Sequence, residues 1–221
     1  MKTVISALTK FILGVLTVGL LVFLPAGGFF YMRGWLLMAV LFVPIAVMGV
    51  VLLIFAPSLL QKRLDTREQD RTQRGVVTLT ALVFLLGFVS AGLDYRFAIS
   101  RVPMWLTYTA VILFLIGYAL YAEVMRENRY LSRTVRVTEG QRVIDTGLYG
   151  VVRHPMYMAS VIMFLMIPLI LGSWISLVIF LCYPVLISVR IVNEEKLLTR
   201  ELDGYERYRR KVKYRLLPFV W

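Results

Sequence analysis

The sequence predicts an all-α integral membrane protein with about six membrane-embedded helices. Hydrophobic residues make up 59% of the 221 residues and charged residues only 17%. The apolar residues gather in long uncharged runs, and basic residues flank these runs. A soluble domain of this length could not bury so much apolar surface, and a disordered chain would be far more polar. We therefore expect residues 1–221 to form a single transmembrane domain.

Four uncharged stretches in the first half are long enough to cross a bilayer. A helix needs about 20 apolar residues to cross the ~30 Å hydrocarbon core. Lipid offers the backbone no hydrogen-bond partners, and the stretches show no sustained alternation, so helices are favoured over barrel strands. The four predicted spanning helices, all within residues 1–122, are Phe11–Met32, Gly34–Gln61, Gly75–Leu93 and Val102–Ala122.

The N-terminus has two interpretations. Lys2 and Lys10 precede an apolar run, as in a signal peptide. However, Ala26-Gly27-Gly28 is followed at once by further apolar residues and the next predicted span. We favour a first helix that is retained.

The last apolar region predicts a helical hairpin. Pro155–Leu171 and Trp174–Val189 are separated by Gly172-Ser173, a pair that favours a turn. Both arms are short and contain a proline, so the hairpin could cross the bilayer or stop part-way. In either case its two open ends lie on the same side of the membrane.

The positive charges predict the orientation. The net charge is +12, and most Lys and Arg residues fall in residues 1–10, 57–75 and 123–154 and in the tail from Arg190. The intervening loops hold only three arginines. The positive-inside rule then places both termini and the two long polar segments in the cytoplasm. Because the basic residues flank apolar runs, we expect an anionic bilayer surface as partner, and not nucleic acid.

A first polar cluster surrounds Pro155. Proline disfavours the helical region for His154 and suits the first turn of a helix, so a helix should begin here. Its free N–H groups and positive dipole end would favour a carboxylate or phosphate. Arg153 and His154 lie beside this start, and Tyr149 and Tyr157 flank it. The plainer alternative is an interfacial belt that only anchors the protein.

A second polar cluster lies where the hairpin's second arm ends. Arg190 and Glu194 are four residues apart and share a helix face, with Asn193 on a neighbouring stripe and Glu195 following. A carboxylate this near the hydrocarbon needs a partner. The pair could be a simple helix-end ion pair or part of a binding face. The predicted hairpin favours the binding face, because it returns this cluster to the membrane side that holds Pro155.

A third element, Leu197–Val212, is predicted either as an amphipathic helix or as a solvated basic tail. Several chemistries are excluded by what the sequence lacks. One histidine and one cysteine, Cys182, cannot form a disulfide or a His/Cys zinc site, so we expect no metal. There is no dinucleotide fingerprint, P-loop, H-E-x-x-H or G-x-S-x-G motif.

The two clusters and the tail resemble one known family. The motifs are Gly147-Leu-Tyr149-x3-Arg153-His154-Pro155-x-Tyr157, then Arg190-x3-Glu194-Glu195-x2-Leu198, then Tyr205-x2-Tyr208-x3-Val212-x2-Arg215-x2-Pro218. Together they resemble the isoprenylcysteine carboxyl methyltransferase family, which is related to the phospholipid methyltransferases. The upstream half is also similar to bacterial members in Arg33-Gly34-Trp35, Pro57-Ser-Leu-Leu-x2-Arg63-Leu64 and Asp94-Tyr-Arg96-Phe97.

The resemblance implies an integral membrane methyltransferase that uses S-adenosyl-methionine. The acceptor would be a lipophilic or small molecule with a carboxylate, amine or thiol, and residues 123–221 would form a cytoplasm-facing cofactor site. Arg190 and Glu194 would be catalytic, and Arg190 and Asn193 would bind substrate. The implied cofactor-binding residues are Tyr149, Arg153, His154, Pro155, Tyr157, Glu194 and Glu195.

Two other functions stay open on the sequence. Sterol-reductase-type membrane enzymes have a similar Arg-His-Pro-x-Tyr pattern but use NADPH, and they typically have more spans. A non-enzymatic transporter or scaffold would explain the spans but not the convergence of two polar clusters.

Overall fold

The computed structural model describes residues 2–64, 71–128, 130–131, 137 and 140–221. Within these ranges the regular structure is helical, with no strand. The helices in chain order are α1 (Lys2–Ala26), α2 (Met32–Phe55), α3 (Pro57–Leu64), α4 (Arg71–Phe97), α5 (Met104–Glu127), η1 (Gly147–Gly150), α6 (Pro155–Leu171), α7 (Trp174–Phe180), α8 (Cys182–Glu201) and α9 (Tyr205–Lys211).

The predicted all-α membrane class is confirmed, but the predicted count of about six membrane-embedded helices is not. In the described part of the chain, five helices are long and apolar enough to cross a membrane: α1, α2, α4, α5 and the combined α7–α8. The sixth, α6, has 17 residues. At a rise of about 1.5 Å per residue it falls short of the ~30 Å hydrocarbon core.

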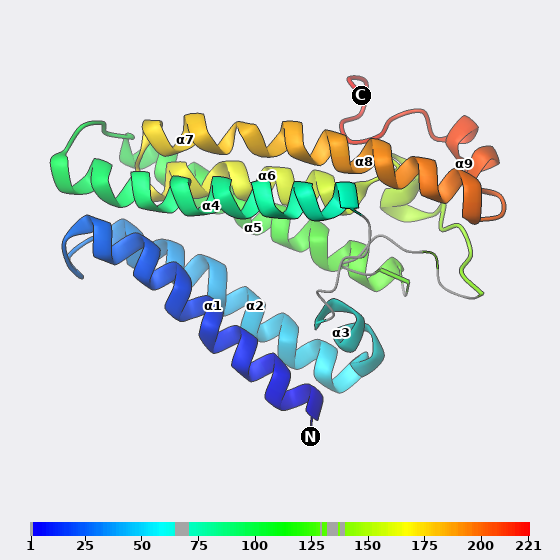
Figure 1. Ribbon diagram of the computed structural model, residues 1–221, viewed down its shortest axis with the longest axis horizontal. Coiled ribbons are helices and arrows are strands. Elements are labelled where there is room, and N and C mark those ends of the chain that lie inside the picture. The colour runs from blue at the N-terminus through cyan, green and yellow to red at the C-terminus, as the bar shows by residue number, and fades with distance from the viewer. Residues whose placement is uncertain (1, 65–70, 129, 132–136, 138–139) are drawn as a thin grey trace.

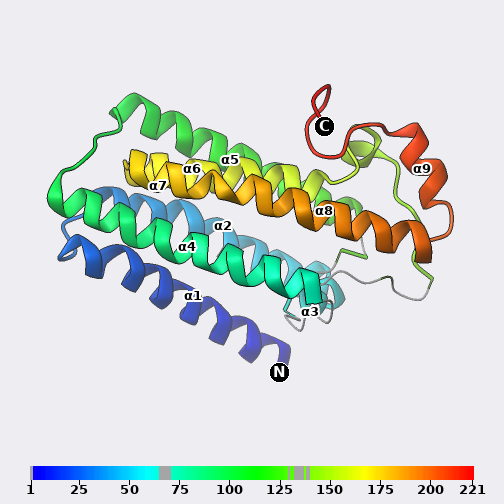
Figure 2. The ribbon, with the colours of Figure 1, turned by 45° about the horizontal axis from the view of Figure 1, so that its top comes forward.

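The long helices lie alongside one another, and the short helices α3 and α9 lie at one end (Figures 1 and 2). That end holds α3, η1, α9 and the C-terminal segment, and the first turn of α1 points toward it. We call it the site end, and the opposite end, at the tip of the α6–α7 hairpin, the distal end. Outward leucines such as Leu16 and Leu20 are more than 60% exposed, as expected of side chains that contact lipid.

Small residues let the helices approach closely. A Cβ atom on Gly92 of α4 would lie 2.7 Å from the Val22 carbonyl oxygen of α1. One on Gly117 of α5 would lie 2.8 Å from the Met163 Cγ of α6. Without a hydrophobic driving force in lipid, such close packing is a main source of helix association. The first approach joins α4 to α1, and the second joins α5 to α6.

The second predicted span is shorter than the sequence suggested. We expected one helix over Gly34–Gln61, but α2 ends at Phe55. Pro57 disfavours the helical region for the residue before it, and Ala56 accordingly has φ −147° and ψ 59°. The remaining residues form α3, whose last turn holds Lys62 and Arg63. The basic residues of this segment therefore lie on a separate helix at the site end.

The predicted hairpin is confirmed. Gly172 has φ +83°, and its N–H contacts the carbonyl oxygens of Pro168 and Leu169, which closes α6. Ser173 then caps α7, because its Oγ accepts the N–H of Ser176 at 3.1 Å.

The second arm differs from the prediction in two ways. It is interrupted at Leu181, between α7 and α8, close before Pro184, whose missing N–H weakens the helix there. It also continues past the predicted end at Val189 as far as Glu201. Arg190 and Glu195 therefore lie within this helix, in agreement with the predicted helix face of Arg190 and Glu194.

The predicted element Leu197–Val212 forms two pieces. The last turns of α8 end at Glu201, and Gly204, with φ +83°, reverses the chain into α9. In α9 the rings of Tyr205 and Tyr208 are buried, whereas Arg209 and Arg210 are exposed. The amphipathic character is therefore present, but it belongs to a short helix folded back over the site end.

At the distal end a buried carboxylate joins two loops. Asp94 is 1% exposed. Its Oδ1 accepts the backbone N–H of Ser100 at 2.6 Å, and its Oδ2 accepts the hydroxyls of Ser100, at 2.5 Å, and of Ser173. The carboxylate thus ties the loop after α4 to the tip of the hairpin.

Replacing Asp94 with alanine should destabilise this end. The buried donors of Ser100 and Ser173 would lose a charged acceptor, and we expect the free energy of unfolding to fall by about 2–3 kcal/mol. Denaturant titration in detergent micelles measures the change. Ser100→Ala, which leaves the contact to Ser173, should have a smaller effect, and equal stability of Asp94→Ala and the unmodified protein would contradict this role.

Candidate functional site

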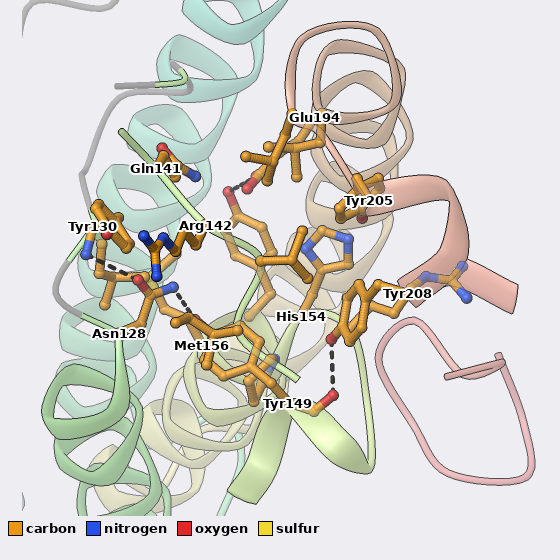
Figure 3. A pocket seen from close by; sticks show the side chains of 18 of the residues that line it. Asn128, Tyr130, Gln141, Arg142, Tyr149, His154, Met156, Glu194, Tyr205 and Tyr208 are labelled. Atoms are coloured by element: carbon orange, nitrogen blue, oxygen red, sulfur yellow. Dashed lines mark hydrogen bonds between the residues drawn. The ribbon is translucent and has the colours of Figure 1, made fainter. Parts of the chain in front are cut away.

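A polar cavity of about 110 Å³ lies at the site end, in a structure that is otherwise mainly apolar (Figure 3). This is several times the ~10–15 Å³ that one water molecule needs. Its wall comes from the end of α5, from residues 141–144, from η1 and from α6, α8 and α9. The described residues that line it are Asn128, Tyr130, Leu131, Gln141, Arg142, Val143, Ile144, Tyr149, Arg153, His154, Pro155, Met156, Tyr157, Arg190, Glu194, Leu198, Leu202, Tyr205 and Tyr208.

The start of α6 is held by the C-terminal segment. His154 is the residue before the helix, with φ −125° and ψ 61°, and Pro155 occupies its first turn, as the sequence predicted. The backbone N–H of Arg153 donates to the Tyr214 carbonyl oxygen, and that of His154 to the Arg215 carbonyl oxygen, both at 2.9 Å. The residues before α6 are therefore fixed against a segment more than fifty positions later in the chain.

Glu195 is the centre of a buried ionic cluster. Its Oε1 lies 2.7 Å from Arg153 Nε and 3.3 Å from His154 Nε2, and its Oε2 lies 2.9 Å from Arg215 Nε. Arg153 also donates from Nη1 to the carbonyl oxygens of Val212 and Lys213, at 2.7 and 2.8 Å. The negative charge of Glu195 offsets the positive charges of Arg153 and Arg215. The ionic cluster therefore joins α8, the start of α6 and the C-terminal segment.

A second polar chain crosses from α8 to α6 and back. Arg190 Nε donates to the Tyr157 hydroxyl at 2.8 Å, and this hydroxyl donates to Glu194 Oε2 at 2.6 Å. Arg190 and Tyr157 are buried, whereas Glu194 is partly exposed. The predicted shared face of Arg190 and Glu194 is thus bridged by a phenol from the other arm of the hairpin. The bridge fixes a cation and a carboxylate side by side on the cavity wall.

Tyr149 joins the cavity wall to α5 and α9. Asn128 Nδ2 donates to the Tyr149 hydroxyl, and the Tyr208 hydroxyl donates to the Tyr149 carbonyl oxygen, both at 2.8 Å (Figure 3). Burial raises the pKa of Tyr149 and of Tyr208 well above the ordinary tyrosine value. Both hydroxyls therefore stay protonated at physiological pH and can act as donors.

An exposed ion pair closes the other side of α9. Lys211 Nζ lies 2.8 Å from Asp145 Oδ2, just before η1. The hydrogen bond from Lys211 holds the pKa of Asp145 below its usual range. The last turn of α9 is thereby attached to the segment that leads into the cavity wall.

Part of the chain that lines the cavity matches a known protein family. Residues 105–203 match the family model of the phospholipid methyltransferases. The resemblance predicted from the motifs is thereby confirmed, because that family is related to the isoprenylcysteine carboxyl methyltransferases. A search of curated proteins found no match to the chain. The match extends from α5 to just beyond α8 and contains every predicted site residue.

In the segment that matches the family model, the structure brings most of the predicted residues to one cavity. The clusters from α6 and α8 meet there, as the hairpin required. Two predicted residues do not line it: Glu195 lies behind the wall in its ionic cluster, and Asn193 is absent from the lining. The predicted residues that line the cavity are Tyr149, Arg153, His154, Pro155, Tyr157, Arg190 and Glu194.

Other residues of the cavity wall were not singled out from the sequence. Asn128 and residues 141–144 precede the first motif, and no local pattern predicts that they reach the cavity. Tyr205 and Tyr208 did stand in the third motif, but without a role. Part of the predicted basic segment, namely residues 129, 132–136 and 138–139, lies outside the described residues, as does Arg67. Among the residues described, no group of three His, Cys, Asp or Glu side chains could hold a metal ion.

Proposed function

We propose that the protein is an integral membrane methyltransferase that uses S-adenosyl-methionine and acts on a lipophilic or small acceptor. The main support is the cavity at the site end. In a segment that matches the phospholipid methyltransferases, an arginine, a carboxylate and several tyrosines meet at the end of a lipid-facing helical bundle. The same match favours this function over an NADPH-dependent reductase.

The residues present fit the proposed cofactor. S-adenosyl-methionine has a carboxylate and an ammonium at one end and a ribose and adenine at the other. The positive end of α6 at Pro155 and the guanidinium of Arg142 suit the carboxylate, and Glu194 suits the ammonium or a ribose hydroxyl. The tyrosine rings of the wall offer flat surfaces for adenine.

The described side chains suggest a division of roles. The cofactor would supply a methyl group activated on a sulfonium. Tyr149, His154 and Tyr157 would shape its pocket, and Arg153 would be held in place by Glu195. Arg190, whose Nε donates to the Tyr157 hydroxyl, lines the cavity and would orient the acceptor.

The need for a base depends on the acceptor. A carboxylate acceptor is already ionised and needs only alignment and exclusion of water. An amine or thiol would require a base, for which Glu194 or His154 is positioned at the cavity. We place Asn193 outside the direct contacts, because it does not line the cavity.

We also propose that the site end faces the cytoplasm. The described basic residues of α3 and α9 lie there, as do Lys10 in α1 and Arg190 in α8. A cytoplasmic orientation would satisfy the positive-inside rule and give the site access to a water-soluble cofactor. Because the bundle around the site is lipid-facing, a lipophilic acceptor could arrive from the bilayer.

Cofactor binding provides the first test. Isothermal titration of the purified protein in nanodiscs should show binding of S-adenosyl-methionine, and NADPH should not compete. Glu194→Ala should weaken binding about tenfold or more, because a charged hydrogen-bond partner is worth about 1.5–3 kcal/mol. Glu201→Ala is the matched control, since Glu201 lies on the same helix, α8, but outside the cavity lining.

Failure of the unmodified protein to bind S-adenosyl-methionine would exclude the proposed enzyme. A scaffold or transporter function would instead be supported if the double variant Arg190→Ala, Glu194→Ala fully replaced the unmodified protein in cells. Mass spectrometry of lipid extracts from cells fed a labelled methyl donor, with and without the gene, would then identify the acceptor.

A further inference from the structure

Tyr205 has a buried hydroxyl that the rest of the site does not use. The residue is 4% exposed, and its ring lines the cavity near Glu194 and His154 (Figure 3). Among the residues that the structure describes, its hydroxyl oxygen has no hydrogen-bond partner. The oxygen is also shielded from bulk solvent, so bulk water does not replace the missing partner. A buried polar group without a partner is rare in folded proteins and calls for a specific explanation.

The second tyrosine of α9 provides a direct contrast. Tyr208 lies one helical turn later, and the two rings pack at 5.8 Å. The Tyr208 hydroxyl donates to the Tyr149 carbonyl oxygen at 2.8 Å, so this residue helps to attach α9 to η1. Apolar contacts with Leu202 and Val212 bury both rings. The ring of Tyr205 therefore contributes to packing, whereas its hydroxyl adds no hydrogen bond within the described structure.

We propose that Tyr205 is a direct ligand-binding residue whose hydroxyl donates a hydrogen bond to an oxygen of bound S-adenosyl-methionine. The inference rests on the proposed function and extends it by one residue, beyond the segment that matches the family model. The group it recognises is a carboxylate or hydroxyl oxygen of the cofactor. No methyl or proton transfer is assigned to the phenol.

The surroundings of Tyr205 favour a donor role. Burial is the main cause that raises its pKa above the ordinary tyrosine value, with further contributions from the nearby carboxylates of Glu195 and Glu194. The phenol therefore stays protonated. Glu195 is already occupied by Arg153, His154 and Arg215, and Glu194 accepts the Tyr157 hydroxyl. An oxygen of the ligand could accept a hydrogen bond from the Tyr205 hydroxyl. A phenylalanine at this position could not donate one.

The test compares Tyr205→Phe with Tyr208→Phe. Tyr205→Phe removes an unbonded hydroxyl, so the melting temperature of the ligand-free protein should stay the same or rise. Its Kd for S-adenosyl-methionine should rise about 5- to 30-fold, the range for one lost hydrogen bond to a polar or charged acceptor. Tyr208→Phe should instead lower the melting temperature, because it removes the bond to Tyr149.

S-adenosyl-homocysteine is a second probe, because it has the same oxygens but lacks the transferred methyl group and the positive charge. Its Kd should rise by the same factor in Tyr205→Phe. A loss confined to S-adenosyl-methionine would place the phenol against the sulfonium and overturn the proposed hydrogen bond.

Three further results would overturn the proposal. An unchanged Kd in Tyr205→Phe would show that the hydroxyl does not contact the ligand. A raised Kd accompanied by a lowered melting temperature would indicate a structural role. If the unmodified protein bound neither compound, the proposed function and this inference would both fail. If the unmodified protein bound S-adenosyl-methionine and Tyr205→Phe bound it with the same Kd, only the inference would fail.

Discussion

Glu195→Gln is expected to lower the free energy of unfolding by about 3–5 kcal/mol, the usual cost of removing one partner from a buried ion pair. Glu195 is 4% exposed, and its two oxygens face the cationic groups of Arg153, Arg215 and the ring of His154. The amide keeps the shape but not the charge. The guanidinium of Arg153 would then remain buried without its carboxylate, and the start of α6 would lose its attachment to α8.

Two measurements check this expectation. Chemical denaturation in detergent gives the stability, and titration with S-adenosyl-methionine gives the accompanying loss of binding. Arg215→Ala is a graded control, because the Arg215 side chain is 33% exposed and water can replace part of its interaction, so it should cost less. Stability of Glu195→Gln equal to that of the unmodified protein would refute the structural role assigned to Glu195.

Arg190→Lys is expected to reduce methyl transfer about 100-fold while leaving the fold intact, because misplacement of a positioning group by about 1 Å can cost this much. The planar guanidinium donates from its Nε to the Tyr157 hydroxyl and also lines the cavity, where it would contact the acceptor. A lysine retains the charge but cannot make both sets of contacts in one plane. The affinity of the Arg190→Lys variant for the cofactor should change far less than its rate of methyl transfer.

The assay follows the methyl group of labelled S-adenosyl-methionine into the lipid extract of membranes that contain the protein. Arg200→Lys is the control, because Arg200 lies on the same helix with its side chain 74% exposed. If Arg190→Lys transferred the label as fast as Arg200→Lys, Arg190 would not orient the acceptor. An equal loss of cofactor binding and rate would instead indicate that Arg190 belongs to the cofactor pocket.

Much of this architecture could be predicted from the chain alone. Lipid forces apolar segments into helices, so uncharged runs indicate the spans directly. Pro155 and Gly172 act locally, and they define the start and end of α6 as the sequence suggested. Because the hairpin returns the chain to its starting side, the meeting of His154 with the α8 residues followed from topology.

The parts that were not predicted depend on contacts between residues that lie far apart in the sequence. Nothing in the pair Glu194-Glu195 indicates that one carboxylate lines the cavity and its neighbour faces a buried ionic cluster. That difference arises because successive residues on a helix point about 100° apart, and only the packing of α6 shows which direction is inward. The break at Pro57 could have been predicted, because a proline disfavours a helical residue before it.

The pairing of Arg153 and His154 with Tyr214 and Arg215 has a consequence for how the protein is made. During synthesis all the bilayer-crossing helices can form before the C-terminal segment that binds the backbone of Arg153 and His154 has been made. We therefore expect the proposed cofactor site to form only after position 215 has been translated, and we expect a fragment that stops at residue 203 to insert into the membrane without binding the cofactor.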